Sequence, residues 1–411
     1  MEENLKHRKG SVKLRVLNEN IPAANKEINI KQKTHQFLFG VGGFEAVELE
    51  GGKPDGQPVD EQRKAFLRDK LDKLFTFNNY ATLPFYIGRY EPEEGKPDET
   101  RLKAAAFYYN KKNIVTKGHP LCWHTVCAPW LMNYSNAEIL KKVIERIERD
   151  VCAFAGIIDI WDVINEVVIM PIFDKYDNAI TRICKEYGQV RIVKEVFTAA
   201  KRANPNSVLL LNDFETSEEY AELIDKCLQE GIPIDVIGIQ SHQHQGYWGS
   251  AKVHEVLDRF ARFGLPLHFT ENTLISGEIM PPHIVDLNDW QVDEWHTTPS
   301  GEERQAREIV EMYEILFAHP LVEAVTTWSG GDNAWLHAPA GFLRVDNSEK
   351  PSYKALRAKI ENDWRTEAAL KTDALGFVIA EGFKGSYEIS CMGKTSSFEI
   401  GKNETLDVLL K

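Results

Sequence analysis

Eight short apolar runs alternate with amphipathic stretches along most of the chain, and this alternation constrains the fold more than any other feature. The apolar runs predict strands at 37–40, 74–78, 114–118, 158–163, 208–212, 236–240, 267–270 and 324–327. The stretches between and after them have helical spacing and cover 61–73, 99–112, 136–153, 189–203, 217–230, 251–263, 302–317 and 352–361. Eight strands, each followed by a helix, predict an α/β fold of the (β/α)8 barrel type over residues 35–365.

A doubly wound open sheet is the structural alternative to the barrel. Such sheets usually carry a glycine-rich phosphate-binding loop directly after their first strand. The segment after the first predicted strand reads VGGFEAVELEGGKP, which does not have that glycine spacing. The sequence therefore favours the barrel.

Strand-like segments also lie at both ends of the chain, outside the barrel pattern. They occur within residues 11–34 and again within 374–410, where turns containing glycine or asparagine separate them. Two strands alone are not stable, and an unpaired sheet edge invites aggregation. We therefore expect residues 1–34 and 366–411 to build one small β-sandwich-like domain. A structural clamp is favoured over an independent sugar-binding module.

One long segment, 275–301, interrupts the regular pattern between the seventh predicted strand and its helix. It contains Trp290 and Trp295. Loops of this length in a compact domain are usually lids or binding loops. The two indoles are expected either to pack within the loop or to serve as a platform for a sugar ring.

The charge balance narrows the choice of partners. The chain has 49 Lys and Arg residues against 62 Asp and Glu residues, which gives a net charge of −13. A negative field repels phosphates and anionic lipids, so we expect neither nucleic acid nor a membrane as partner. The N-terminal segment has no apolar signal core, so a cytoplasmic location is expected unless a secretion signal has been removed. The six scattered cysteines are expected to be reduced thiols, without a zinc site.

Polar side chains follow the predicted strands where, in a barrel, the active site lies. Glu166 and Glu271 follow the fourth and seventh strands, so their carboxyl groups can face each other. One carboxyl group can protonate a glycosidic oxygen while the other attacks the anomeric carbon or activates water. Hydrogen bonds to sugar hydroxyls can come from Asn165, Asn212, Gln240 and His119, and flat apolar faces from Trp123, Trp328 and Trp335.

These motifs carry a resemblance to a known family. IWDVINEVV resembles the acid/base motif of glycoside hydrolase family 10, the retaining β-1,4-xylanase family. GHPLCWHTVCAPW resembles its strand-three motif, and its later motifs are matched in order by LLLNDFE, GIQSHQH, LHFTENT, TTWSGGDNAW and KPSYKAL. The resemblance spans about residues 35–361. It implies a (β/α)8 barrel that cleaves xylan internally with net retention and without a cofactor.

The resemblance also implies roles for individual residues. Glu166 matches the general acid/base and Glu271 the nucleophile, while Asn165 matches the residue that binds the sugar 2-hydroxyl. His242 matches the imidazole that orients the nucleophile, with Asp213 or Asn272 expected nearby. The remaining matches are substrate contacts at His119 and Gln240 and walls of the cleavage subsite at Trp123 and Trp328.

The segment around the second strand departs from the family pattern. Xylanases of the family carry a stretch like ENEMKW there, whose Glu, Asn and Lys hold the non-reducing xylose. Here the stretch reads TLPFY over residues 82–86, and Tyr86 is a candidate substrate contact. Val126 and Asn272-Thr273 also depart from the usual residues. The sequence therefore predicts a retaining glycosidase that acts on short or modified oligosaccharides rather than on plain polymeric xylan.

Two other functions compete with this interpretation. The first is a metal-dependent barrel hydrolase that uses His119, His242 and Asp213. The pair His242 and His244 has a spacing that binds metal in other barrels, but no matching carboxylate pattern accompanies it, so no metal is expected. The second is a sugar-binding protein on a degenerate barrel without turnover. The presence of both glutamates argues against it.

Overall fold

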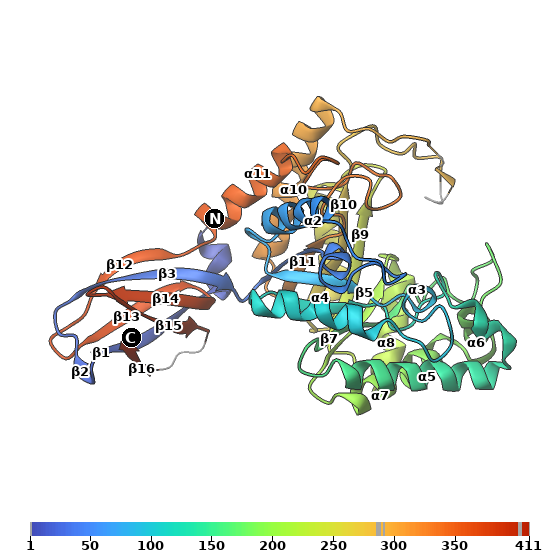
Figure 1. Cartoon of the computed structure of the whole chain (residues 1–411), viewed down its shortest axis with the longest axis horizontal. Coiled ribbons are helices and arrows are strands. Elements are labelled where there is room, and N and C mark those ends of the chain that lie inside the picture. Colours follow the sequence, from blue (N-terminus) through green and yellow to red (C-terminus); the bar gives the residue numbers. More distant parts are fainter. Residues whose placement is uncertain (1, 285–288, 291, 402–404, 411) are drawn as a thin grey trace.

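A closed barrel of eight strands, each parallel to its neighbours, forms the centre of the molecule in the computed structural model (Figure 1). The structure describes residues 2–284, 289–290, 292–401 and 405–410. The barrel strands are β4 (Leu38–Gly42), β5 (Tyr80–Pro84), β6 (Val115–His119), β7 (Ile160–Asn165), β8 (Val208–Asp213), β9 (Val236–Gln243), β10 (Leu267–Leu274) and β11 (Val322–Thr327). Pairing of β11 with β4 closes the ring. The predicted (β/α)8 barrel is confirmed.

Helices follow the barrel strands and bury their apolar faces against them. The longer ones are α2 (Glu61–Leu74), α4 (Glu99–Lys111), α5 (Asn136–Ala153), α7 (Gln189–Ala203), α8 (Glu218–Gln229), α9 (Gly249–Ala261), α10 (Pro299–Ala318) and α11 (Pro351–Ala358). The short helices α1 (Glu45–Gly51), α3 (Ile87–Tyr90) and α6 (Ala179–Tyr187) lie in connections. Among the described residues, no helix combines the length and the apolar character that crossing a membrane requires.

The second barrel strand lies later in the chain than its apolar pattern predicted. The run 74–78 is not a strand, because α2 continues to Leu74 and buries Leu71 and Leu74 against the core. Asn78 then donates a side-chain hydrogen bond to the Leu74 carbonyl, which closes the end of the helix. Asn79 accepts a bond from the Phe39 backbone N–H at 2.9 Å and so places the following residues beside β4. The apolar residues of the run 74–78 thus belong to the end of α2 and the turn after it, and β5 begins at Tyr80.

This shift changes the environment of the divergent segment 82–86. Thr82 and Leu83 now lie within β5 and are fully buried. Phe85 packs edge-on against Trp161, with ring centroids 4.9 Å apart, and is also buried. Tyr86 is the partly exposed aromatic residue of the segment.

The two ends of the chain form a sandwich of two four-stranded sheets beside the barrel (Figure 1). One sheet contains β1 (Lys9–Asn18), β2 (Ile21–Pro22), β13 (Phe377–Phe383) and β16 (Thr405–Leu410). The other contains β3 (Glu27–His35), β12 (Glu367–Lys371), β14 (Gly385–Cys391) and β15 (Lys394–Ile400). Apolar side chains of both sheets, such as Leu14, Ile30 and Ile389, share one buried cluster. The predicted sandwich is confirmed, while the boundaries at 34/35 and 365/366 stay a prediction.

Arg8 fastens the sandwich to the end of the barrel at which the strands begin. Arg8 is the last residue of a short 3-10 helix, Glu2–Arg8, which directly precedes β1. Its guanidinium group donates hydrogen bonds to the carbonyls of Phe317, His319 and Val322, which surround the start of β11. The guanidinium carbon also lies 4.6 Å from the centre of the Phe37 ring. The opposite end of the barrel, where the strands finish, is left for the polar residues described next.

Candidate active site

Glu166 and Glu271 lie at the finishing ends of β7 and β10. Glu166 directly follows β7 and has a left-handed backbone with φ of 58°, which is uncommon for a residue other than glycine. Its backbone N–H donates to the Asn212 carbonyl at 2.8 Å, which holds this conformation. Glu271 is 4% exposed and lies in β10 where the register with β9 shifts. Both carboxyl groups are therefore placed by strand ends rather than by free loops.

A chain of side-chain amides connects the two glutamates. The Asn212 Nδ2 group donates to Oε1 of Glu271 at 2.9 Å and to Oδ1 of Asn165 at 2.7 Å. The Gln240 Nε2 group donates to the same Asn165 oxygen at 3.1 Å and to Oε1 of Glu166 at 3.2 Å. The predicted polar residues of β7, β8 and β9 thus meet in one network between the carboxyl groups.

The environment of Glu166 favours a protonated carboxyl group. Burial among protein atoms raises its pKa most, and the negative charge of Glu271 raises it further. Hydrogen bonds from Trp123 and Gln240 to its oxygens act in the opposite direction but do not cancel the rise. A carboxyl group with a raised pKa is suited to donate a proton.

The environment of Glu271 favours the ionised form. Burial alone would raise its pKa, but the charges of His119, Lys117 and His242, together with a hydrogen bond from His242, bring the pKa below its ordinary value. The His242 Nε2 atom lies 3.2 Å from Oε2 of Glu271, and the His119 Nε2 atom lies 3.9 Å from Oε1. The two glutamates therefore have pKa values shifted in opposite directions, which suits them to different chemical roles.

A buried ion pair stands behind His119 and was not anticipated from the sequence. The Nδ1 atom of His119 lies 2.7 Å from Oδ2 of Asp162, and the Lys117 ammonium group lies 2.7 Å from the same oxygen. The side chains of Lys117 and Asp162 are both fully buried. The sequence feature that could have indicated this pair is a charged residue within each of two buried strands, Lys117 in β6 and Asp162 in β7.

The second ring nitrogen of His242 faces a threonine. The Nδ1 atom of His242 lies 3.2 Å from the hydroxyl of Thr273, which directly follows Asn272 in β10. Asp213 instead accepts hydrogen bonds from the backbone N–H groups of Val168 and Glu215, each at 3.0 Å. Its burial raises its pKa to about 7. Asp213 thus supports the loop that follows Glu166 rather than the imidazole beside Glu271.

Aromatic rings enclose the two carboxyl groups. Trp335 stacks on His242 with ring centroids 4.4 Å apart and planes within 9°. Trp328 packs edge-on against His119 at 5.0 Å, and Tyr86 lies between His119 at 5.5 Å and Trp123 at 5.6 Å. Every side chain proposed for the site from the sequence is connected to this cluster through ring contacts or hydrogen bonds.

Phe44 joins the aromatic enclosure and was missed in the sequence. It follows β4 and meets Trp328 at 5.7 Å and Tyr86 at 6.3 Å. Only its position after the first strand could have signalled it. Trp295, by contrast, packs inside its own loop, because it is 6% exposed and its indole N–H donates to the Glu278 carbonyl at 2.7 Å.

The metal-binding alternative lacks a suitable donor set. Within the described ranges, no group of three or more His, Cys, Asp and Glu side chains is placed to hold a metal ion. His242 faces Glu271, whereas Asp213 is engaged with backbone N–H groups. The six cysteines are free thiols.

Comparisons with known proteins agree with these features. A model of glycosyl hydrolase family 10 matches residues 61–359. The endo-1,4-beta-xylanase B of Thermotoga neapolitana is 26% identical over 270 residues, which cover 61% of this chain and 71% of the relative. An endo-1,4-beta-xylanase/feruloyl esterase of Xylanibacter ruminicola is 25% identical over 292 residues, but the match spans only 39% of that relative's length.

Solved structures show the same fold at low sequence identity. The native xylanase 10B from Thermotoga maritima superimposes with a TM-score of 0.62 at 19% identity, covering 80% of this chain and 96% of that one. Xylanase 10B from Thermotoga petrophila RKU-1, solved in complex with xylobiose, gives a TM-score of 0.63 at 18% identity over 80% and 95% of the two chains. The match of the family model covers well over half of the chain, which therefore belongs to glycosyl hydrolase family 10, a family of retaining endo-β-1,4-xylanases.

Proposed function

We propose that this chain cleaves β-1,4-xylosidic or related β-glycosidic bonds by double displacement, with Glu166 as acid/base and Glu271 as nucleophile. The observation that carries the proposal is the opposite direction of the two pKa shifts within one hydrogen-bonded network. A protonated acid and an ionised nucleophile must coexist at one pH, and this network supports that combination.

In the first step, a carboxylate oxygen of Glu271 attacks the anomeric carbon while the bond from that carbon to the leaving oxygen breaks. Glu166 transfers its proton to the leaving oxygen. The resulting ester neutralises Glu271, so the negative charge that raised the pKa of Glu166 is removed. Glu166 can then act as a base that takes a proton from water, and this water displaces Glu271 with net retention.

We also propose that short or substituted oligosaccharides are better substrates than plain polymeric xylan. Tyr86, in the segment where the family pattern has polar groups, packs against His119, whose imidazole lies beside Glu271. Phe44 packs against Tyr86 and extends this aromatic wall. A pocket of about 560 Å³ adjoins this wall and offers room for a substituent; it is lined by Phe44, Val47, Glu48, Lys53, Pro54, Asp55 and Arg101. Relatives named as xylanases support a xylosyl unit at the cleavage point.

A substrate panel with product analysis tests the proposal. The panel contains polymeric xylan, xylotetraose, an aryl β-xyloside and an aryl β-glucoside, and proton NMR records the configuration of the first product. A β product supports Glu271 as nucleophile, whereas an α product would mean that water attacks directly. Absence of turnover on all four substrates would favour the sugar-binding alternative, and loss of activity with a strong chelator would favour the metal-dependent one.

A further inference from the structure

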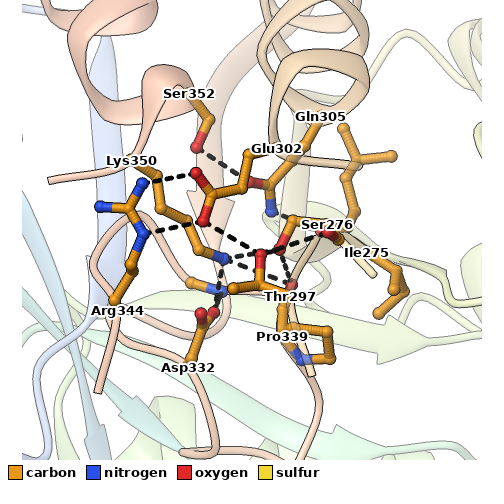
Figure 2. A network of polar contacts seen from close by, with 12 residues as sticks. Ile275, Ser276, Thr297, Glu302, Gln305, Asp332, Pro339, Arg344, Lys350 and Ser352 are labelled. Carbon is orange, nitrogen blue, oxygen red and sulfur yellow. Dashed lines mark hydrogen bonds and ion pairs between the residues drawn. The ribbon is translucent and has the colours of Figure 1, made fainter. Parts of the chain in front are cut away.

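A buried lysine, Lys350, forms the centre of a polar network that makes no direct hydrogen bond to Glu166 or Glu271 (Figure 2). Its side chain is fully buried, and its ammonium group lies 2.6 Å from Oδ1 of Asp332. It also donates to the Ser276 hydroxyl at 2.7 Å and to the Pro339 carbonyl at 3.4 Å. A buried ammonium group is costly unless such partners surround it. The fold therefore surrounds this ammonium group with the polar partners that its burial requires.

The network joins both ends of the long connection between β10 and α10. Ser276 stands at the start of this connection, and its hydroxyl lies 2.7 Å from the Thr297 hydroxyl near the end. The Thr298 backbone N–H donates to the Ser276 carbonyl at 2.9 Å. Lys350, which directly precedes α11, thus fixes the point at which the connection leaves and rejoins the barrel.

A second ion pair reinforces this junction. Glu302 in the first turn of α10 receives hydrogen bonds from Arg344 through both carboxylate oxygens, at 2.8 and 2.5 Å. The Thr297 hydroxyl donates to Oε1 of Glu302 at 3.1 Å, so the two parts of the network are continuous (Figure 2). The junction therefore contains two acidic and two basic groups that neutralise each other.

The same network also fixes the loop that carries Trp335. Asp332 and Pro339, both bound by Lys350, lie on either side of Trp335 in the sequence. The Pro339 carbonyl additionally accepts the Ser276 backbone N–H at 2.9 Å. Trp335 packs against the apolar cluster formed by Ile275, Met280, Trp295, Ala338 and Ala340. Its ring then stacks on His242, which contacts Glu271.

We propose that Lys350 and Asp332 are positioning residues that hold Trp335 against His242 and thereby determine how tightly the substrate binds above Glu271. The proposal rests on the proposed glycosidase function. A displaced Trp335 would remove one wall of the site but leave the environments of Glu166 and Glu271 largely intact. Loss of the pair should therefore raise KM more than it lowers kcat.

A charge-neutral double variant separates positioning from stability. Lys350→Met alone leaves the Asp332 carboxylate buried without its cation, which destabilises the fold for electrostatic reasons. Lys350→Met combined with Asp332→Asn removes both charges, so part of the stability should return while the bonds to Ser276 and Pro339 stay lost. Lys359→Met is the matched control, because Lys359 is largely buried and likewise pairs with carboxylates, those of Glu314 and Asp363.

The experiment measures kcat and KM on an aryl β-glycoside that the parent protein turns over. We expect KM to rise about tenfold in both Lys350 variants, with kcat within about threefold, since loss of a contact that the ground state and the transition state share raises KM without lowering kcat. Amide exchange over 275–284 and 332–343 should accelerate. The fluorescence assigned to Trp335, obtained by subtracting spectra recorded in a Trp335→Phe background, should shift to longer wavelength. Lys359→Met should change none of these quantities.

An unchanged KM and unchanged exchange in the double variant would overturn the proposal. If neither Lys350 variant folds, Ser276→Ala decides, because it removes hydrogen bonds of the junction without changing its charge. A rise in KM with faster exchange over 332–343 in Ser276→Ala supports the proposal, and parental values contradict it. Exchange and fluorescence need no turnover, so an inactive parent protein would refute the proposed function while these readouts still judge the positioning role.

Discussion

The indole N–H of Trp123 donates a hydrogen bond to Oε2 of Glu166 at 2.8 Å. This bond stabilises the ionised carboxylate and so opposes the burial and the Glu271 charge that raise the pKa of Glu166. The pKa of the proposed acid thus depends on burial and on the Glu271 charge, which raise it, and on the Trp123 hydrogen bond, which lowers it. Removing the indole donor should therefore raise the pKa of Glu166.

Trp123→Phe should move the alkaline limb of the kcat/KM profile to higher pH. The acid must be protonated, so activity falls as the pH rises through the pKa of Glu166, and loss of the indole donor raises that pKa. Profiles of the parent and the variant on one substrate measure the shift. Trp130→Phe serves as control, because the Trp130 indole donates to the Glu91 carbonyl instead. A shift to lower pH would contradict the role given to this bond.

Lys117→Met should move the acidic limb to higher pH. The nucleophile must be ionised, so activity falls as the pH drops through the pKa of Glu271. The positive charge of Lys117 is one of the groups that hold this pKa low. The profile is compared with that of Lys112→Met, which removes an exposed lysine paired with Asp72. A lower melting temperature with an unmoved acidic limb would leave Lys117 a purely structural role.

Glu166→Ala should reduce activity on xylotetraose by about 10²- to 10⁴-fold, the usual contribution of general acid catalysis. Aryl glycosides with good leaving groups need little protonation, so their first step should suffer much less. Azide should accelerate the variant by attacking the glycosyl ester, with a β-glycosyl azide as product. The parent protein with azide is the control. Equal losses on both substrates without azide rescue would remove Glu166 from the acid/base role.

The barrel, and the position of the two glutamates at strand ends, could be predicted because each depends on local pattern. Apolar runs end directly before Asn165 and within a few residues of Glu271, and strand ends define the active face of a barrel. The second strand could not be placed, since Leu74 and Phe77 are equally apolar whether they end a helix or form a strand. Only the hydrogen bonds of Asn78 and Asn79 distinguish the two.

Partners within the site were harder to predict than the site itself. Thr273 faces His242 because the β9–β10 register shifts between Phe269 and Glu271, and a sequence pattern does not contain cross-strand register. In the sequence, Lys350 is only the first residue of the helix motif KPSYKAL, and nothing there indicates its role. Its partners Ser276 and Asp332 lie 74 and 18 residues away along the chain, so only the folded structure brings them together.

Deletion of residues 372–411 should lower the melting temperature by roughly 5 °C or more, as expected for losses of a few kcal/mol. The deletion removes the partners of β1 on both sides, β13 and β16, and removes β14 from β3. A shorter deletion of 405–411 removes β16 and should have a smaller effect. Both proteins should keep their catalytic constants if they fold, because the sandwich joins the opposite end of the barrel. An unchanged melting temperature in the longer deletion would show that the sandwich does not stabilise the chain.

Tyr86 forms one wall of the site, between His119 and Trp123, and should restrict which substrates bind. Residues Leu83 and Phe85 are buried in the core, so the proposed substrate preference is assigned to Tyr86 rather than to the whole segment 82–86. A sugar hydroxyl left without a partner costs about 1–3 kcal/mol, which is roughly one to two orders of magnitude in kcat/KM. The parent protein should therefore act at least about tenfold better on an aryl β-xyloside, whose apolar aglycone needs no such partner, than on plain xylan. Tyr86→Lys, which restores a polar group, should narrow this difference, whereas Tyr86→Phe should preserve it. If plain xylan is the best substrate by tenfold or more, Tyr86 does not restrict the site.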